Sequence, residues 1–279
     1  MSRLLATSDL HVGHRGNRPV VEELTPTDPG DWLIVAGDVG DRLTDIEWAL
    51  GLLAQRFAQV IWVPGNHELW TSRSDPDPVK GVARYDRLVE LCRGLGVLTP
   101  EDEYPRWTGP GGPALIVPMF LLYDYSFHAP GTTSKDESLA YARTTGVVCS
   151  DEFLLDPDPY PSRDAWCRAR VAATRERLDA LPTDDPLILV NHWPLTRYPT
   201  RVLRYPEFAQ WCGTTLTSEW HRTFRVLAGV YGHLHIPRTT WEDGVRFEEV
   251  SLGYPREWRA RKRPTVVPRQ ILPAPAEHS

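Results

Sequence analysis

The chain has 279 residues, of which 41% are hydrophobic and 24% are charged. This composition is typical of a globular protein with a packed core, and the length fits one large α/β domain. The formal net charge of −6 gives no support to a general nucleic-acid binder, which usually carries a basic excess.

Six short apolar runs have the length and composition of buried strands. They cover residues 3–6, 32–36, 60–63, 114–119, 187–190 and 226–231. Three helices are expected, over residues 45–55, 77–92 and 162–181. Strands that alternate with helices in this way predict a layered α/β domain with the helices outside the sheets.

Two of these helices show an apolar stripe. In the first, Ile46, Leu50, Leu53 and Phe57 recur at helical spacing. In the third, Ser162 is expected to cap the amino end. The inner stripe of this helix is expected to contain Trp166, Ala169, Ala173 and Leu181.

Two long segments, 120–161 and 196–225, are aromatic and rich in turn-forming residues. Loops of this length in a compact domain are usually functional, so we expect both to face a substrate. We therefore expect one domain over residues 1–264. The Pro/Ala-rich residues 265–279 are expected to form a loosely held tail.

The sequence also indicates where the chain resides. Its first residues become charged and polar too early for a signal peptide, and no apolar run is long enough to span a bilayer. The cysteines, Cys92, Cys149, Cys167 and Cys212, are scattered without CxxC spacing. We therefore expect a cytoplasmic protein without disulfides, without a membrane partner and without a nucleophilic cysteine.

Polar residues follow five of the predicted strands. In chain order they are Asp9 with His11, Asp38, Asn66 with His67, His192, and His233 with His235. Each group alone has an ordinary alternative, such as a turn-capping aspartate or a hydrogen-bonded structural histidine. All of them together, each at the carboxyl end of a strand, indicate one shared site.

These residue types indicate a metal centre. Residues two apart in an extended segment point the same way, so Asp9 with His11, and His233 with His235, are able to converge. Imidazoles, carboxylates and one amide suit transition metals better than Ca²⁺ or Mg²⁺. We expect two divalent or trivalent ions, with iron and manganese as the first candidates and zinc or cobalt as alternatives. Two such ions against two carboxylates leave a positive site that suits a phosphate.

The order of motifs, D-x-H, GD-x-x-D, GNHE, NHxP and GHLH, resembles the calcineurin-like metallophosphoesterase superfamily. The resemblance spans residues 9–235 and implies a four-layer α/β/β/α sandwich with two metal ions between its sheets. It assigns one ion to Asp9, His11, Asp38 and His235. It assigns the other to Asp38, Asn66, His192 and His233.

The resemblance also implies a role for His67, which is the superfamily's histidine that does not bind metal. It would stabilise the phosphate and protonate the departing oxygen after in-line attack of activated water, without a phosphoenzyme. Asp41 matches the partner that holds this histidine, and Glu68 is the alternative. Arg42 resembles a phosphate-binding arginine, although it could also be a solvated residue that starts a helix.

Beyond the metal motifs, the segments VPMFLLYDYSF, DEFLLDPDPYPSRDAWC and GVRFEEVSLGYPREW resemble an actinobacterial metallophosphoesterase group that acts on holo acyl carrier proteins. The resemblance implies cleavage of 4′-phosphopantetheine from the carrier serine. Segment 196–225, with Arg197, Arg201, Arg204, Arg222 and Arg225 among aromatic residues, would bind the acidic carrier. The alternatives are a phosphatase or phosphodiesterase for a small molecule or nucleotide, and a non-catalytic scaffold of the same fold.

Overall fold

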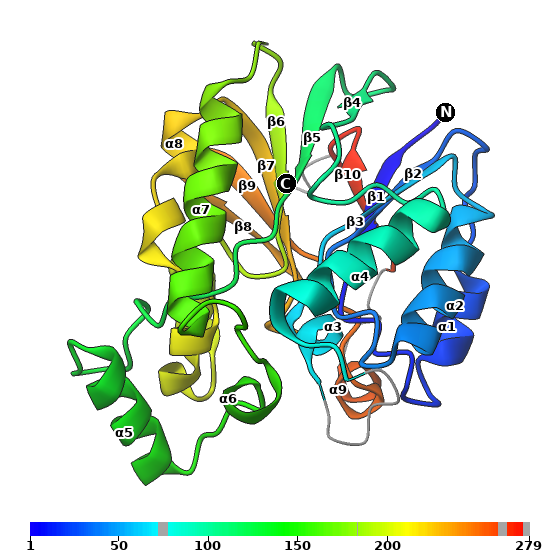
Figure 1. The fold of residues 1–279 in the computed structure, drawn as a ribbon. Helices are drawn as coiled ribbons and strands as arrows, with labels where there is room; N and C mark the ends of the chain where they lie inside the picture. The colour runs from blue at the N-terminus through cyan, green and yellow to red at the C-terminus, as the bar shows by residue number, and fades with distance from the viewer. Residues whose placement is uncertain (72–77, 183, 262–266, 276–279) are drawn as a thin grey trace.

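The computed structural model describes residues 1–71, 78–182, 184–261 and 267–275. Within these residues, the first sheet has the strand order β10-β1-β2-β3 (Figure 1). Its strands are β1 (Leu4–Thr7), β2 (Trp32–Val35), β3 (Gln59–Trp62) and β10 (Arg269–Leu272). The first three run parallel, and helices α1 (Arg18–Glu23) and α2 (Leu43–Ala54) lie in the connections between them.

The second sheet has the order β4-β5-β6-β7-β9-β8. Its strands are β4 (Arg106–Trp107), β5 (Ala114–Pro118), β6 (Leu187–Val190), β7 (Val226–Tyr231), β8 (Arg238–Glu242) and β9 (Val245–Glu249). The four central strands are parallel, and the two edge strands are antiparallel to their neighbours. Parallel strands buried on both faces explain the continuous apolar runs in the sequence.

The two sheets pack face to face around a common core. Alternate residues of β1, β2 and β3, such as Leu4, Ile34 and Ile61, contact Ile188 and Val230 of the second sheet. Helices α2 and α4 (Gly81–Gly94) cover the outer face of the first sheet, and α7 (Arg163–Asp179) and α8 (Trp220–Thr223) cover that of the second (Figure 1). This four-layer α/β/β/α sandwich confirms the fold that the family resemblance implied.

The six predicted strands are all present, each within one residue at either end. Helices α2, α4 and α7 correspond to the three predicted helices, although residue 77, the predicted start of α4, lies outside the described residues. Ser162 caps α7 as expected, because its hydroxyl accepts a hydrogen bond from the Ala165 amide at 3.3 Å.

The predicted stripe of α7 is partly wrong. Trp166 is buried, but Ala173 is exposed. The buried face consists of Trp166, Cys167, Val171, Thr174 and Leu178. A polar threonine and a cysteine replace the expected alanines there, so apolar periodicity alone did not identify the buried face.

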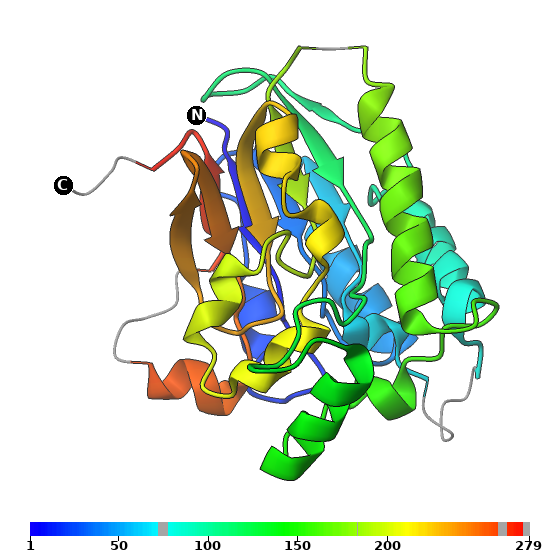
Figure 2. The same cartoon turned by 90° about the vertical axis from the view of Figure 1, so that its left-hand side faces the viewer.

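The two long segments contain short helices rather than plain loops. Segment 120–161 contains α5 (Lys135–Thr145) and α6 (Asp151–Leu154). Segment 196–225 contains the 3₁₀ helices η1 (Tyr198–Val202), η2 (Pro206–Trp211) and η3 (Thr215–Thr217), followed by α8. Helix α5 contacts η2, and both lie at the end of the sandwich that also carries α9 (Pro255–Ala260) (Figure 2).

The sequence did not predict β9 or β10. Strand β9 reads VRFEE, and all five residues are buried despite three charges, because Arg246 and Glu248 lie 3.3 Å apart and Arg246 also donates to the Ile271 carbonyl. The tail expected over 265–279 is therefore wrong for residues 269–272. They form β10, antiparallel to β1, and Arg269 donates to the Glu249 carbonyl at 2.9 Å.

Among the described residues, no helix combines the length and the hydrophobicity that crossing a bilayer requires.

Candidate metal centre

The carboxyl ends of strands from both sheets meet at one end of the sandwich. Asp9 and His11 follow β1, Asp38 follows β2, Asn66 and His67 follow β3, His192 follows β6, and His233 and His235 follow β7. The sheets are joined here, because the Ser8 amide donates to the Val250 carbonyl and the Leu252 amide donates to the Ser8 carbonyl. Residues from strands far apart in sequence therefore lie together.

The backbone of this site is strained at five positions. Left-handed φ angles occur at Asp9 (53°), His11 (41°), Asp38 (56°), His233 (69°) and His235 (55°). Residues with a Cβ rarely adopt this conformation, which costs about 1–3 kcal/mol each. Such strain is typical of sites where function requires side chains to face one point.

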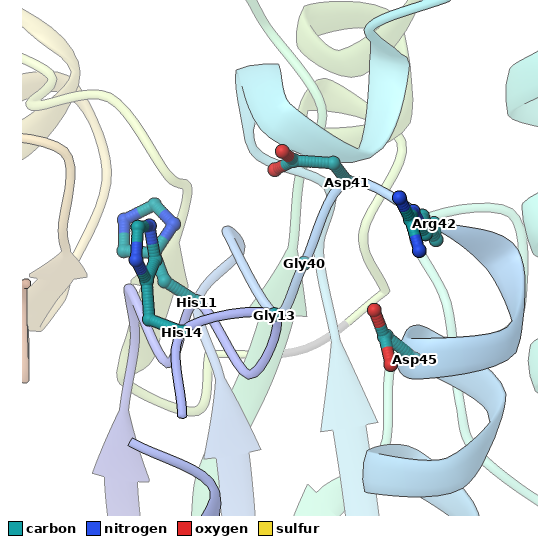
Figure 3. Close-up of a pocket in the computed structure, with 7 residues that line it drawn as sticks. All are labelled: His11, Gly13, His14, Gly40, Asp41, Arg42 and Asp45. Atoms are coloured by element: carbon teal, nitrogen blue, oxygen red, sulfur yellow. The ribbon is translucent and has the colours of Figure 1, made fainter. Parts of the chain in front are cut away.

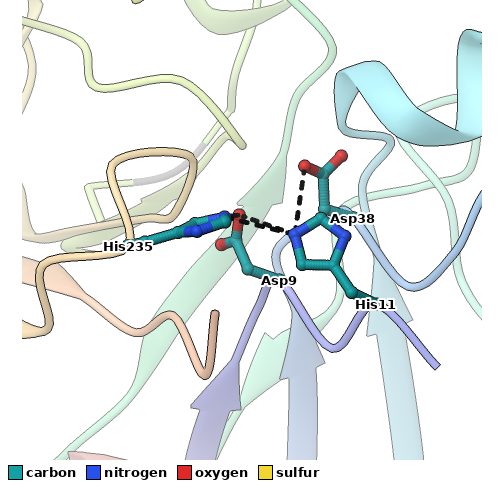
Figure 4. Close-up of side chains that lie close together, drawn as sticks. All are labelled: Asp9, His11, Asp38 and His235. Atoms are coloured by element: carbon teal, nitrogen blue, oxygen red, sulfur yellow. Dashed lines mark hydrogen bonds and ion pairs between the residues drawn. The ribbon is translucent and has the colours of Figure 1, made fainter. Parts of the chain in front are cut away.

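Four of the predicted ligands form a first cluster. Asp9, His11, Asp38 and His235 point toward one another above the ends of β1 and β2 (Figure 4). His235 Nε2 lies 2.9 Å from Asp9 Oδ1 and 3.1 Å from His11 Nε2. His11 Nε2 lies 3.9 Å from a carboxylate oxygen of Asp9 and of Asp38. The ligand atoms of this cluster all lie within 4.8 Å of one another.

A second cluster adjoins the first through Asp38. His192 Nε2 lies 3.4 Å from Asp38 Oδ2 and 3.2 Å from Asn66 Oδ1. His233 Nδ1 lies 3.2 Å from the same Asn66 oxygen and 3.3 Å from His192 Nε2. Asp38 therefore faces both clusters.

The donor atoms of both clusters fit metal ions. His192 Nδ1 donates to the Ala36 carbonyl at 2.8 Å, and His235 Nδ1 lies 2.7 Å from Glu257 Oε2. When these two rings are neutral, their Nε2 lone pairs therefore point into the clusters, toward oxygens of Asn66 and of the carboxylates. Converging lone pairs repel unless a cation lies between them, and these nitrogen and oxygen donors suit transition metals.

The charges lead to the same conclusion. Burial and the charge of a neighbouring histidine lower the pKa of His11 and of His233 to about 3. Burial opposes protonation of His192 and His235 too, yet the charges of Asp38 and Asp9 raise the pKa of these imidazoles to about 9 and about 10. In the metal-free chain, one histidine of each cluster therefore favours the protonated form: His235 in the first cluster and His192 in the second. A bound metal ion would displace that proton.

His67 stands beside both clusters. Its Nδ1 lies 2.7 Å from Asp41 Oδ1, and its Nε2 lies 3.8 Å from Asp38 Oδ2. Burial alone would lower the pKa of His67, but the charge of Asp38 and the hydrogen bond to Asp41 raise it. Asn66 and His67 open the short helix α3 (Asn66–Leu69), where adjacent side chains point in different directions.

Glu68 has a different function from Asp41, because its carboxylate contacts backbone amides instead of His67. Its Oε1 accepts from Val39, and its Oε2 accepts from Asp38 and Gly65, all within 2.9 Å. Burial, together with the charge of Asp38, raises the pKa of Glu68 to about 7. Glu68 thus fixes the end of β2 against the end of β3, whereas Asp41 contacts His67.

Glycine is required at two motif positions, because carboxylate oxygens of the first cluster lie too close to the backbone there for a Cβ atom. A Cβ at Gly65 would lie 2.1 Å from Asp38 Oδ1, and one at Gly232 would lie 2.3 Å from Asp9 Oδ2. Side chains at either position would therefore displace a carboxylate of the first cluster.

A pocket of about 270 Å³ opens beside the first cluster and is lined by His11, His14, Asp41, Arg42 and Asp45, among others (Figure 3). The carboxylate of Asp41 points toward the side that His11 lines, whereas Arg42 lies on the other side, near Asp45 (Figure 3). Arg42 is exposed and borders the pocket, so it is not part of either cluster.

Fewer side chains of segment 196–225 are available to bind a partner than its sequence suggested. Arg222 binds Asp243 and Glu219, Arg225 donates to the Asp184 carbonyl, and Trp211 is buried. Phe208 stacks on the ring of His233 at 5.9 Å. Arg225 aside, the exposed arginines of this segment that have no carboxylate partner among the described residues, and most of its exposed large hydrophobic side chains, lie in and next to η1.

Sequence reasoning missed three supporting residues. Asp151 of α6 accepts hydrogen bonds from the Asn66 amide at 2.9 Å and from the Trp70 indole at 2.7 Å. Glu257 accepts from the Tyr254 amide and contacts His235, and Tyr254 lies over His11. The pattern Tyr-Pro-x-Glu, with proline at the first helical position and glutamate two residues later, could have identified the start of α9.

The four-layer fold and the paired histidine–carboxylate clusters define a metal-dependent phosphoesterase. The chain belongs to the calcineurin-like phosphoesterase family, whose model matches residues 2–237.

A curated relative and a solved structure each match nearly the whole chain. The chain is 62% identical over 272 residues to the acyl-carrier-protein phosphodiesterase PptH of Mycobacterium tuberculosis (strain ATCC 25618 / H37Rv), covering 98% of this chain and 84% of that protein. The crystal structure of phosphopantetheinyl hydrolase (PptH) from Mycobacterium tuberculosis matches with a TM-score of 0.96 at 61% identity, covering 98% of this chain and 97% of that one.

Proposed function

We propose that the chain is a two-metal phosphodiesterase that removes 4′-phosphopantetheine from the serine of a holo acyl carrier protein and returns the apo form. The observation that carries this proposal is the 62% identity to PptH, named an acyl-carrier-protein phosphodiesterase, over 98% of the chain. Family membership by itself supports only phosphoester hydrolysis. The location we propose is a reducing cytoplasm, which the four buried, free cysteines support.

The two clusters would hold the two metal ions, one in Asp9, His11, Asp38 and His235 and the other in Asp38, Asn66, His192 and His233. When bound, the ions supply Lewis acidity that lowers the pKa of water and offsets phosphoryl charge. We propose iron and manganese, with zinc or cobalt as alternatives; the nitrogen and oxygen donors suit transition metals as a class.

His67 would be the general acid. The Asp41 carboxylate, 2.7 Å from Nδ1, keeps a proton on that nitrogen and directs Nε2 toward the clusters. As water adds to phosphorus, the bond between phosphorus and the serine oxygen breaks and its electron pair goes to that oxygen. The Nε2 proton then neutralises the serine oxygen, and the proton released by the attacking water restores His67.

The exposed part of segment 196–225 would contact the carrier protein. Three arginines and three apolar residues are exposed in and around η1: Arg197, Arg201, Arg204, Tyr198, Val202 and Tyr205. Among the described residues no carboxylate pairs with these arginines; Arg201 lies over Tyr198 and Arg204 over Tyr205. A positive, aromatic surface on a chain of net charge −6 suits an acidic partner.

The test is the mass of a holo carrier protein after incubation with the metal-loaded chain. Loss of the phosphopantetheine mass, with the apo protein as product, is the expected result. An unchanged carrier together with rapid turnover of nucleotide diesters would replace this proposal with the small-molecule alternative. Arg201→Glu combined with Arg204→Glu should raise KM for the carrier and leave a small diester unaffected, whereas Arg87→Glu on α4 serves as the control.

A further inference from the structure

Tyr254 lies over the first cluster without being one of its ligands. Its ring stacks on His11 with centroids 4.5 Å apart and an interplanar angle of 23°, and its edge meets His235 at 4.9 Å. The backbone around it is fixed, because the Gly253 amide donates to the Asp9 carbonyl and the Tyr254 amide donates to Glu257. The position of this phenol is therefore set by the same contacts that set the cluster.

The hydroxyl of Tyr254 lies beside the imidazole nitrogen that faces the clusters. Tyr254 Oη is 3.3 Å from His67 Nε2, which in turn is 3.8 Å from Asp38 Oδ2. Since Asp41 occupies the other nitrogen of His67, the hydroxyl and Nε2 form a pair of polar groups beside Asp38, the residue that faces both clusters. Tyr254 is only partly buried, so a ligand is able to reach it.

We propose that Tyr254 is a catalytic residue whose hydroxyl donates a hydrogen bond to a non-bridging oxygen of the phosphoryl group, beside His67. This inference rests on the proposed phosphodiesterase function. A phosphoryl group that contacts both clusters would bring its oxygens next to Oη and Nε2, and the contact between these two atoms would be replaced by contacts with the substrate.

The type of donor fits the type of ester. A phosphodiester carries one negative charge, so a neutral phenol beside the metal ions suffices, whereas a monoester dianion favours additional positive charge. The predicted phosphate-binding arginine, Arg42, lies on the far side of the adjoining pocket (Figure 3), whereas the Arg256 guanidinium lies 5.7 Å from the centroid of the Tyr254 ring.

Tyr254→Phe tests the inference, because phenylalanine keeps the ring on His11 and removes only the hydroxyl. Loss of one donor to developing charge costs about 10²–10³ in kcat when the donor is fully enclosed, and we expect about ten- to hundred-fold for this half-buried one. The loss should be similar for holo carrier protein and for bis(4-nitrophenyl) phosphate, because a non-bridging oxygen is present in both. Metal content should stay unchanged, and inhibition by inorganic phosphate should weaken.

Tyr104→Phe is the matched control, since this tyrosine lies with Leu115 at the opposite end of the second sheet and should retain full activity. If the wild-type chain cleaves both diesters and Tyr254→Phe cleaves them equally fast, the inference is overturned and the proposed function stands. Loss of metal from Tyr254→Phe would also overturn it, because the role would then be structural. A wild-type chain that cleaves neither diester would overturn both proposals.

Discussion

The contact between Asp41 and His67 gives the sharpest prediction, because replacing Asp41 by asparagine changes one charge and almost no volume. The carboxylate lies 2.7 Å from His67 Nδ1, and both the hydrogen bond and its charge raise the pKa of His67. Asparagine retains a carbonyl acceptor but removes the charge. The pKa of His67 should then fall. At neutral pH a smaller fraction of His67 would carry the second proton and be able to donate it.

The expected size follows from the exposure of Asp41. A hydrogen bond to a charged group contributes about 1.5–3 kcal/mol when buried. The Asp41 side chain is 60% exposed, so water screens part of this, and we expect about 1–2 kcal/mol. That corresponds to a fall in kcat of about five- to thirty-fold.

The assay compares two diesters in the same variant. The serine oxygen of a holo carrier protein is a poor leaving group that needs a proton, whereas 4-nitrophenolate leaves without one. Asp41→Asn should therefore slow cleavage of holo carrier protein and leave bis(4-nitrophenyl) phosphate almost unaffected, with two metal ions still bound. Equal losses on both substrates, or no loss on either, would refute the reasoning that Asp41 acts through the acid function of His67.

Two further predictions concern the scaffold and the metal ions. Glu68→Gln should lower the free energy of unfolding by about 2–3 kcal/mol in urea titrations and reduce metal content, because a side-chain NH₂ would face a buried amide donor; a change below about 0.5 kcal/mol would contradict this. The affinity of the metal-free chain for each ion should rise about tenfold per pH unit between pH 6 and 8, because His192 or His235, whose pKa is raised, must lose a proton when the ion binds. An affinity that does not change with pH in a chelator competition would contradict the assignment of these histidines as ligands.

Patterns of spacing in the sequence predicted the sheets and the metal ligands well. The apolar runs of β6 and β7 have the bounds that the structure shows, because strands buried on both faces read as continuous apolar sequence. His192 and His233 could be located because each lies two residues after such a run. The open choice between Asp41 and Glu68 could not be decided in this way, since Glu68 adjoins His67 and Asp41 lies 26 residues away, and spacing does not show which carboxylate reaches the ring.

What the sequence could not predict depends on contacts between distant segments. Strand β9 reads as charged, and only its pairing with β7 and the ion pairs around Arg246 allow it to be buried. Asp151 lies 85 residues from Asn66 along the chain, and no local signal connects them. The hydroxyl of Tyr254 reaches His67 only because β9 lies next to β7, which brings residues 251–257 to the edge of the site.

The central claim, that polar residues at the strand ends form two metal sites sharing Asp38, is tested most directly by metal analysis of the purified chain. The wild type should contain two transition-metal ions per chain. Asn66→Ala should contain one, because Asn66 contributes only to the second cluster. A wild-type chain that binds one ion or none after metal loading would contradict the account.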